Sequence, residues 1–303
     1  MNIIGKRRLY FLISLLVMVP GLISLGLYGL NLSIDFTGGS RMSVLFDKSV
    51  GNEQVDFIKS GLEDQKIKVS AIEKTDKVVI VRTSPMDQKQ NNEFVKDLTN
   101  KYKDAKQQEF STIGPTIGRE TTVNALKAVV FAAILVVMYI SLVFRKVPKP
   151  ASSIRFGVST IVALIHDVLV VVGIFSLLGH FLNVEIDALF VTALLTVIGF
   201  SVHDTIVVFD RIRENLGKNV NESFAQVVND SILQTIGRSL NTSITVLLVL
   251  FALLLFGGES IRWFVVALII GIASGTYSSI FNASPILVVW HEWSLKRNRN
   301  KNN

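Results

Sequence analysis

The chain alternates between long apolar runs and polar segments, one of which is much longer than the rest. A membrane-spanning helix needs about 20 mainly apolar residues to cross a hydrocarbon core about 30 Å thick. Six runs approach or exceed that length with few charges, and they cover residues 9–30, 123–144, 156–178, 188–209, 239–256 and 263–290. The pattern therefore predicts a polytopic α-helical membrane protein with six transmembrane helices.

The first apolar run follows Lys6, Arg7 and Arg8 and so imitates a secretory signal peptide. It is longer than the apolar region of such a peptide, and no Ala-x-Ala-like cleavage site follows it. We therefore expect residues 1–30 to form a cytoplasmic N-terminus and a retained first helix, and residues 121–290 to contain the other five.

The long polar segment, residues 31–120, alternates between strand-like and helical periodicity. Alternation of apolar and polar residues indicates strands, and apolar residues three or four positions apart indicate helices. Strands are expected at 41–46, 68–73, 78–82 and 107–113, and helices at 52–65 and 87–103. This βαββαβ order predicts one external α+β domain of ferredoxin-like type. It carries no cluster of histidines and carboxylates, which favours a binding or moving domain over an enzyme.

The net charge of +7, from 31 basic and 24 acidic residues, comes from the apolar part of the chain, because residues 31–120 are charge-balanced. A basic nucleic-acid-binding domain is therefore excluded as its source. The positive-inside rule places both termini in the cytoplasm, including a basic tail at 291–303, and residues 31–120 outside. The basic residues on the cytoplasmic side are Lys6, Arg7, Arg8, Arg145, Lys146, Lys149, Arg155, Arg211, Arg213, Lys218, Arg238, Lys296, Arg297, Arg299 and Lys301.

Three sets of ionisable residues lie within or at the ends of apolar runs, where a charge is costly and by default marks a functional site. The third run contains His166 and Asp167, the fourth contains His203 and Asp204, and the fifth begins at Arg238. A guanidinium favours the charged form of a nearby carboxylate, whereas desolvation disfavours it. An Asp204–Arg238 pair would thus have two protonation states, which is the minimum for a proton-driven switch.

Structural explanations compete with this one. Buried Ser, Thr, Asn and His side chains often only fix helix register, and this explanation stays open for His166 and Asp167. Adjacent residues on a helix diverge by about 100°, so neither His–Asp pair is expected to bind a metal. Gly271 and Gly275 belong to a stripe of small residues in the sixth run, which predicts close helix packing. Segment 211–237 has helical periodicity and is expected to form an amphipathic helix on the cytoplasmic face.

Two motifs resemble the SecF family of protein-export membrane proteins, within the RND superfamily. They are IDFTGG at 34–39 and SVHDTIVVFDRIREN at 201–215, supported by HDV at 166–168 and by IGP at 113–115. The resemblance covers essentially the whole chain. It implies six helices, one external domain and a multi-pass protein of a bacterial or archaeal plasma membrane.

The resemblance also implies a function: SecD and the SecYEG channel as partners, SecA acting indirectly, preproteins as substrates, and proton motive force as the energy source. It implies no enzyme activity and no cofactor. The family's essential aspartate and arginine match Asp204 and Arg238. The residue before the aspartate is commonly Asn in the family and is His203 here, which leaves open whether His203 joins the relay and whether the ion is H⁺ or Na⁺.

In the first motif, Gly38 and Gly39 are expected to permit backbone angles that other residues rarely adopt, with Asp35 capping or hydrogen-bonding the turn. Three other functions stay open from the residues alone. One is an RND-type transporter of a lipid or small molecule, and one is a scaffold whose buried charges are structural. The third is an intramembrane aspartyl protease using Asp167 and Asp204, although the Gly-x-Gly-Asp pattern is absent.

Overall fold

The computed structural model describes residues 2–145, 147–148, 151–218 and 221–299, with the side chains of 298 and 299 excepted. Of the basic residues used above for orientation, Lys146, Lys149 and Lys301 lie outside the described residues, as does the end of the expected tail. The chain forms two compact units, a helical unit of residues 1–31 and 127–303 and a smaller unit of residues 32–126.

Six described segments are long and apolar enough to cross a membrane, which confirms the six predicted transmembrane helices. The last of them is broken into several pieces. The helices are α1 (Arg7–Tyr28, preceded by the short η1, Ile4–Lys6), α5 (Pro115–Val143), α6 (Ser153–Leu182), α7 (Ala188–Lys218), α8 (Phe224–Phe256), and finally η2 (Glu259–Ile261), α9 (Arg262–Ser278), the π-helical η3 (Ser279–Ala283) and α10 (Ser284–Arg299).

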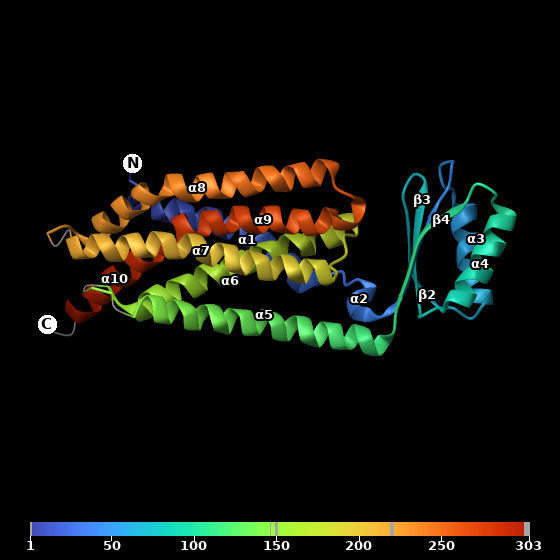
Figure 1. The fold of residues 1–303 in the computed structure, drawn as a ribbon, viewed down its shortest axis with the longest axis horizontal. Helices are drawn as coiled ribbons and strands as arrows, with labels where there is room; N and C mark the ends of the chain where they lie inside the picture. Colours follow the sequence, from blue (N-terminus) through green and yellow to red (C-terminus); the bar gives the residue numbers. More distant parts are fainter. Residues whose placement is uncertain (1, 146, 149–150, 219–220, 300–303) are drawn as a thin grey trace. The chain divides into compact units, whose positions relative to one another are not determined.

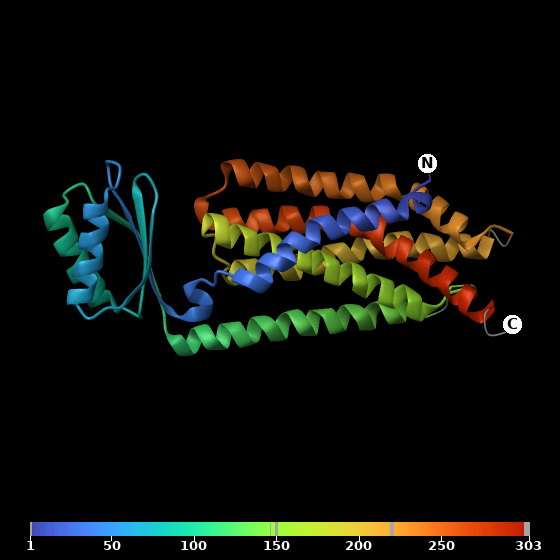
Figure 2. The same ribbon diagram turned by 180° about the vertical axis from the view of Figure 1, so that it is seen from behind.

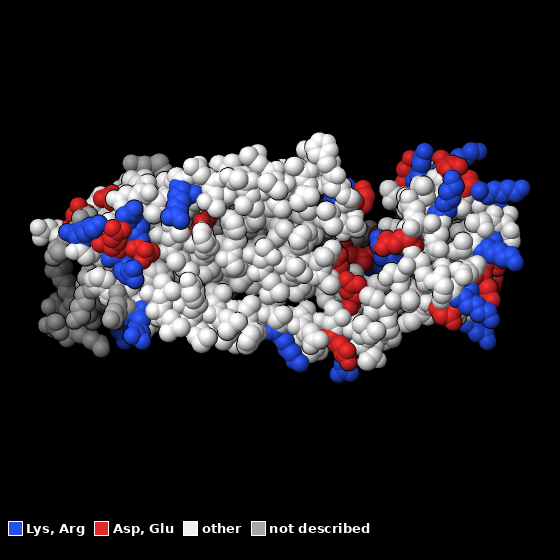
Figure 3. All heavy atoms as spheres, in the orientation of Figure 1, with Lys and Arg blue, Asp and Glu red and all other residues white. Residues whose placement is uncertain are grey.

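The helices of the helical unit run side by side, and α1 begins at the same end at which α10 finishes (Figure 1; Figure 2 shows the same unit from behind). A core at that end contains Phe144, Phe156 and Phe209, whose ring centroids are 4.8–5.9 Å apart. Large apolar side chains on α1, α5 and α8 are exposed. The surface over the helices is largely uncharged between the charged ends (Figure 3), as a bilayer requires.

Close approach between helices depends on glycines that face one another or a small side chain. A Cβ built on Gly271 would lie 2.1 Å from Cγ2 of Val197, and one on Gly275 would lie 3.0 Å from Cβ of Ser201. These glycines therefore let α9 pack tightly against α7. A Cβ on Gly21 would lie 2.7 Å from Cα of Gly173, so α1 and α6 meet in the same manner.

The segment 211–237 differs from the expectation of a separate amphipathic helix. Its first part is the end of α7, and its last part, from Phe224, is the beginning of α8. Ser223 caps α8, because its Oγ accepts a hydrogen bond from the backbone N–H of Gln226. The apolar residues that suggested a surface helix, among them Val228 and Ile232, are instead buried in the core of the helical unit.

The smaller unit has the βαββαβ order expected from the sequence. Its elements are β1 (Gly39–Leu45), α3 (Asn52–Asp64), β2 (Val69–Lys74), β3 (Val78–Thr83), α4 (Gln88–Lys101) and β4 (Lys106–Ile113). The strands form an antiparallel sheet in the order β2-β3-β1-β4, with Met42 opposite both Val81 and Phe110. The helices cover one face, burying Ile58 and Leu62 of α3 and Phe94 and Leu98 of α4, which are four residues apart on each helix.

Before β1, the short helix α2 (Ile34–Thr37) is capped by Ser33, whose Oγ accepts from the backbone N–H of Asp35. Gly38 and Gly39 follow with φ of 71° and 119°, angles that side chains other than glycine rarely adopt. A Cβ on Gly38 would lie 2.8 Å from Cα of Pro115, and one on Gly39 would lie 2.6 Å from the carbonyl oxygen of Thr83. Both glycines thus permit a positive φ and close backbone contact.

Candidate functional site

Two carboxylates are buried among the transmembrane helices. Asp167, on α6, is 0% exposed, and Asp204, on α7, is 2% exposed. A buried carboxylate needs hydrogen-bond donors or an opposite charge to offset its desolvation. The partners of the two carboxylates differ sharply, and this difference defines the site.

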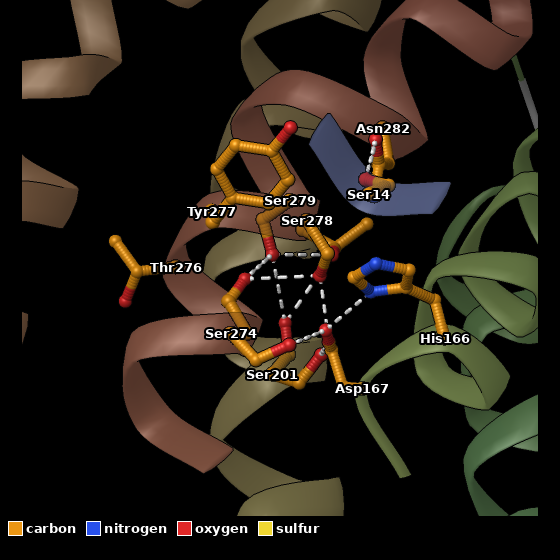
Figure 4. Close-up of polar contacts among 12 residues, drawn as sticks. Ser14, His166, Asp167, Ser201, Ser274, Thr276, Tyr277, Ser278, Ser279 and Asn282 are labelled. Atoms are coloured by element: carbon orange, nitrogen blue, oxygen red, sulfur yellow. Dashed lines mark hydrogen bonds and ion pairs between the residues drawn. The ribbon is translucent and has the colours of Figure 1, made fainter. Parts of the chain in front are cut away.

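Asp167 accepts hydrogen bonds from four side chains on three helices (Figure 4). Ser201 on α7 and Ser278 on α9 each donate to Oδ2 at 2.6 Å. Ser274 donates to Oδ1 at 2.7 Å, and Nδ1 of His166 lies 3.0 Å from the same oxygen. Donors from neighbouring helices thus satisfy the carboxylate, and these hydrogen bonds join α6 to α7 and α9.

The serines of α9 were not singled out as site residues from the sequence, which indicated small-residue packing there. Ser274 and Ser278 are four residues apart and so share one helix face. The π-helical η3 begins directly after them, and wider turns of this kind occur frequently at functional sites. Ser279, its first residue, lies 2.8 Å from Oγ1 of Thr205 and donates to the carbonyl oxygen of Ser201 at 3.1 Å.

Asp204 has weaker partners. Oγ of Ser243, on α8, lies 3.5 Å from its Oδ2, and Nδ1 of His203 lies 3.7 Å from its Oδ1. The hydroxyl of Ser239, also on α8, interacts with the same carboxylate. Ser243 also shares a 2.5 Å hydrogen bond with Thr276. His203 itself is 59% exposed, so it lies beside the buried carboxylate and not within the packed interior.

Arg238 does not pair with Asp204 in this structure, although the sequence suggested that the two would meet. Its side chain is exposed, and among the described residues no carboxylate lies within ion-pair distance of it. The side of α8 that packs inward carries a row of small polar residues at every fourth position, Ser231, Thr235, Ser239 and Ser243, beside its buried apolar residues. Arg238 therefore belongs to a different, exposed face of α8.

That exposed face is polar around Arg238. Asn241 and Thr245 are exposed and Thr242 is half-buried, with Thr242 and Thr245 donating to backbone carbonyl oxygens one turn earlier. A polar face with a full charge is costly against lipid. We call the four residues Arg238, Asn241, Thr242 and Thr245 the α8 polar face.

The geometry is also informative about two other kinds of site, an aspartyl protease site and a metal site. An aspartyl protease requires two carboxylates that share a proton, but the four donors to Asp167 do not include Asp204, which has partners of its own. Among the described residues, no group of three or more His, Cys, Asp or Glu side chains could hold a metal ion. What the arrangement offers is one firmly held carboxylate and one weakly held carboxylate.

The fold and site define a class: a multi-pass helical membrane protein with an α+β domain after its first helix and carboxylates buried between its helices. The family model "Protein export membrane protein SecD/SecF, C-terminal" matches residues 93–293, and "SecD/SecF GG Motif" matches residues 23–50. The chain belongs to the SecD/SecF family of protein-export membrane proteins, as the two sequence motifs suggested.

Similar proteins cover the whole chain. The protein translocase subunit SecF of Thermobaculum terrenum is 46% identical over 309 residues, 98% of this chain and 96% of that protein. SecF of Anaerolinea thermophila is 42% identical over 301 residues, 97% of this chain and 96% of that protein. The protein translocase subunit SecDF of Bacillus subtilis is 36% identical, and the match covers 97% of this chain but 38% of that one.

Solved structures agree in fold. The crystal structure of SecDF from Thermus thermophilus, described as a translocon-associated membrane protein, matches with a TM-score of 0.83 and 34% identity. The match covers 96% of this chain and 39% of the SecDF chain. A SecDF structure in a super-membrane-facing form matches with a TM-score of 0.71, covering 99% and 40%. This chain thus spans about two fifths of the SecDF structures that it matches.

Proposed function

We propose that this chain is a SecF-type subunit of the Sec protein translocation machinery, which acts with SecD and uses the proton motive force to promote export of preproteins through SecYEG. SecA acts indirectly, by driving the preceding ATP-dependent steps. The chain lies in the plasma membrane with both termini in the cytoplasm and residues 31–120 outside. The proposed role is that of a non-enzymatic translocase subunit.

The contrast between the two buried carboxylates carries this proposal. Asp167 holds four donors and is therefore assigned to structure, whereas Asp204 is as deeply buried but weakly held. A carboxylate with one long hydrogen bond can change partners at little cost, so we assign proton exchange to Asp204. Moving one charge across a potential of 100 mV releases about 2.3 kcal/mol, comparable with a packing change between two helix arrangements.

The α8 polar face supports SecD as the partner. It leaves Arg238 exposed at the beginning of the fifth apolar run, where an unpaired charge is costly. In Bacillus subtilis SecDF and in the SecDF structures, the matching region is joined in one chain to a larger remainder. We assign the α8 polar face to contact with SecD, which would supply a carboxylate or other polar groups to Arg238.

Asp204→Asn tests the function, with Asp210→Asn as its matched control. Both substitutions remove a carboxylate from α7, but Asp210 is exposed and pairs with Arg213 at 2.7 Å. In vesicles containing this chain, SecD, SecYEG and SecA, we expect Asp204→Asn to abolish the gradient-dependent part of preprotein export and Asp210→Asn to retain it. Full gradient-dependent export by the Asp204 variant would refute the proposal, and repeating the assay with a sodium gradient identifies the coupling ion.

A further inference from the structure

Two hydroxyl groups connect Asp204 with helix α9. Oγ of Ser243, on α8, lies 3.5 Å from Oδ2 of Asp204 and shares a hydrogen bond of 2.5 Å with Oγ1 of Thr276, on α9. Thr276 in turn donates to the carbonyl oxygen of Ile272 at 2.9 Å. The exposed fractions of Asp204, Ser243 and Thr276 are 2%, 2% and 6%, so these groups depend on one another for hydrogen bonds.

The direction of these hydrogen bonds follows from the number of protons. A hydroxyl group has one proton to donate and two lone pairs that accept. Thr276 gives its proton to Ile272, so Ser243 donates the short hydrogen bond between the two hydroxyls and Thr276 accepts it. Ser243 then has no proton left for Asp204. A hydrogen bond between Asp204 and Ser243 therefore requires, in this arrangement, that the proton is on the carboxyl group.

The opposite direction suits the charged carboxylate. When Asp204 loses its proton, Ser243 rotates its hydroxyl to donate to the carboxylate, and Thr276 rotates its own to donate to Ser243 and leaves Ile272. Each hydroxyl keeps its proton, so the change needs rotation about two Cβ–O bonds and no covalent step. The two directions of the hydroxyl chain thus correspond to the two protonation states of Asp204.

The other groups beside Asp204 do not replace this chain. Nδ1 of His203 lies 3.7 Å from Oδ1, the carboxylate oxygen that does not face Ser243, and His203 is exposed. The hydroxyl of Ser239 also interacts with the carboxylate, but no hydrogen bond among the described residues continues from it to another helix. Ser243 and Thr276 therefore form the side-chain connection from Asp204 to α9 in the described part of the chain.

Helix α9 also contacts the second buried carboxylate. Ser274 and Ser278, which donate to Asp167, lie two residues before and two residues after Thr276. Two residues correspond to about 200° around a helix, so Thr276 lies on the other side of α9 from the two serines. Figure 4 shows its side chain apart from theirs. A change at Thr276 is therefore a change on the same helix that holds Asp167.

We propose that Thr276 is a positioning residue for proton coupling, which transmits the protonation state of Asp204 to α9 through the direction of the Ser243–Thr276 hydroxyl pair. This inference rests on the function proposed for Asp204 and extends it to a residue that does not touch the carboxylate. It requires the hydroxyl of Thr276, whereas a role in packing alone requires only the shape of the side chain.

Two substitutions at position 276 separate these requirements. Thr276→Val keeps the branched shape and removes the hydroxyl, whereas Thr276→Ser keeps the hydroxyl and removes the methyl group. Thr160→Val is the matched control, because Thr160 is also buried and donates to a carbonyl oxygen of its own helix, that of Phe156 on α6. Monodisperse elution of each full-length variant is the folding check.

Infrared difference spectra between acidic and neutral buffer report the Asp204 carboxyl group directly. They are recorded on the full chain in vesicles, and the C=O band that is missing from Asp204→Asn is assigned to Asp204. We expect Thr276→Val to move this band to higher wavenumber, because a Ser243 hydroxyl that no longer donates onward is a weaker acceptor. Thr276→Ser and Thr160→Val should keep the wild-type band. An unmoved band in Thr276→Val, or an equal shift in Thr276→Ser, would overturn the proposal.

Gradient-dependent export measures the consequence for function, in vesicles that also contain SecD, SecYEG and SecA. Thr276→Val should lower it about tenfold, the effect of one buried hydrogen bond, and Thr276→Ser and Thr160→Val should retain it. Full gradient-dependent export by Thr276→Val would show that the hydroxyl plays no part in coupling. The infrared measurement needs no export, so failure of the function proposed for Asp204, seen as full export by Asp204→Asn, is distinguished from failure of the hydroxyl chain.

Discussion

Ser243, and not Arg238, is the α8 side chain that reaches Asp204, with its Oγ 3.5 Å from Oδ2 of the carboxylate. The two candidates are five residues apart, which on an α-helix separates them by about 140° around the axis. The small serine packs inward and the arginine faces outward. The buried carboxylate of Asp204 and the guanidinium of Arg238 therefore belong to different surfaces of the same pair of helices.

Arg238→Ala should leave the stability of this chain alone within about 0.5 kcal/mol, because substitutions of exposed residues without partners have small effects. The same variant should weaken association with SecD if the α8 polar face is the contact. Thermal unfolding of the purified chain and co-purification with SecD measure the two effects. Leu240→Ala, also exposed on α8 but about 160° around the helix from Arg238, is the control that should keep both properties.

Asp167→Asn should destabilise the chain by about 1–3 kcal/mol, because an amide nitrogen in place of one carboxylate oxygen leaves buried donors without an acceptor. Asp204→Asn should cost less, since its carboxylate has one long hydrogen bond. Reversible unfolding in mixed micelles compares the two variants. An equal loss of stability would show that the four donors to Asp167 do not distinguish it from Asp204.

Combining Ser278→Ala with Asp167→Asn gives a second measure of the same contact. The hydroxyl of Ser278 donates to Asp167 at 2.6 Å, so the two substitutions remove one shared interaction and their effects should not add. We expect an interaction energy of about 0.5–3 kcal/mol in the double-mutant cycle. Additive effects would assign the stabilisation by Ser278 to its other hydrogen bond, to the carbonyl oxygen of Gly275.

Gly271→Ala should destabilise the helical unit by about 1–3 kcal/mol, the usual cost of overpacking, because its Cβ would meet Val197. Gly199→Ala is the matched control, since it adds the same methyl group to the partner helix α7 where nothing lies within 4 Å. That control should be neutral or stabilising by up to about 1 kcal/mol, the helix propensity difference. Comparing the free energies of unfolding of both variants under the same conditions shows whether overpacking or helix propensity determines the effect of the added methyl group.

Gly39→Ala should destabilise the chain by more than Gly114→Ala. The first glycine has a φ of 119° and no room for a Cβ beside the carbonyl oxygen of Thr83, whereas nothing lies within 4 Å of a Cβ on the second. A positive φ for a residue with a Cβ costs about 1–2 kcal/mol before the contact is counted. Susceptibility of residues 32–126 to a protease added to the detergent-solubilised chain, measured for both variants, reports the difference.

Much of the fold follows from local pattern. The six transmembrane helices and the βαββαβ order were predicted because span length and residue periodicity are properties of contiguous sequence. The segment 211–237 shows the limit of such patterns. Its apolar spacing identified a helix correctly, but the same spacing describes a helix at a membrane surface and the buried end of a longer one, and only the contacts of Val228 and Ile232 tell them apart.

The candidate site was predicted as a set of residue types. Asp167, Asp204 and Arg238 are ionisable residues within or at the end of apolar runs, where a charge has a high free-energy cost. Their partners were not predictable in this way. Ser274 and Ser278 are ordinary small residues until helix packing brings them to Asp167. Likewise, the choice of which face of α8 turns inward depends on the sum of contacts with α7 and α9.

The sequence by itself determined how many times the chain crosses the membrane, because this depends on the length of the apolar runs. It also determined where the α+β domain is inserted, from residue periodicity, and which ionisable residues lie where burial of a charge is unfavourable. The tertiary structure alone decided that Asp167 is saturated, that Asp204 is weakly held and that Arg238 faces outward. Hydrogen bonds between helices join residues as far apart in the sequence as Asp167 and Ser278. Such bonds depend on the rotation of each helix about its axis, which a run of apolar residues does not specify.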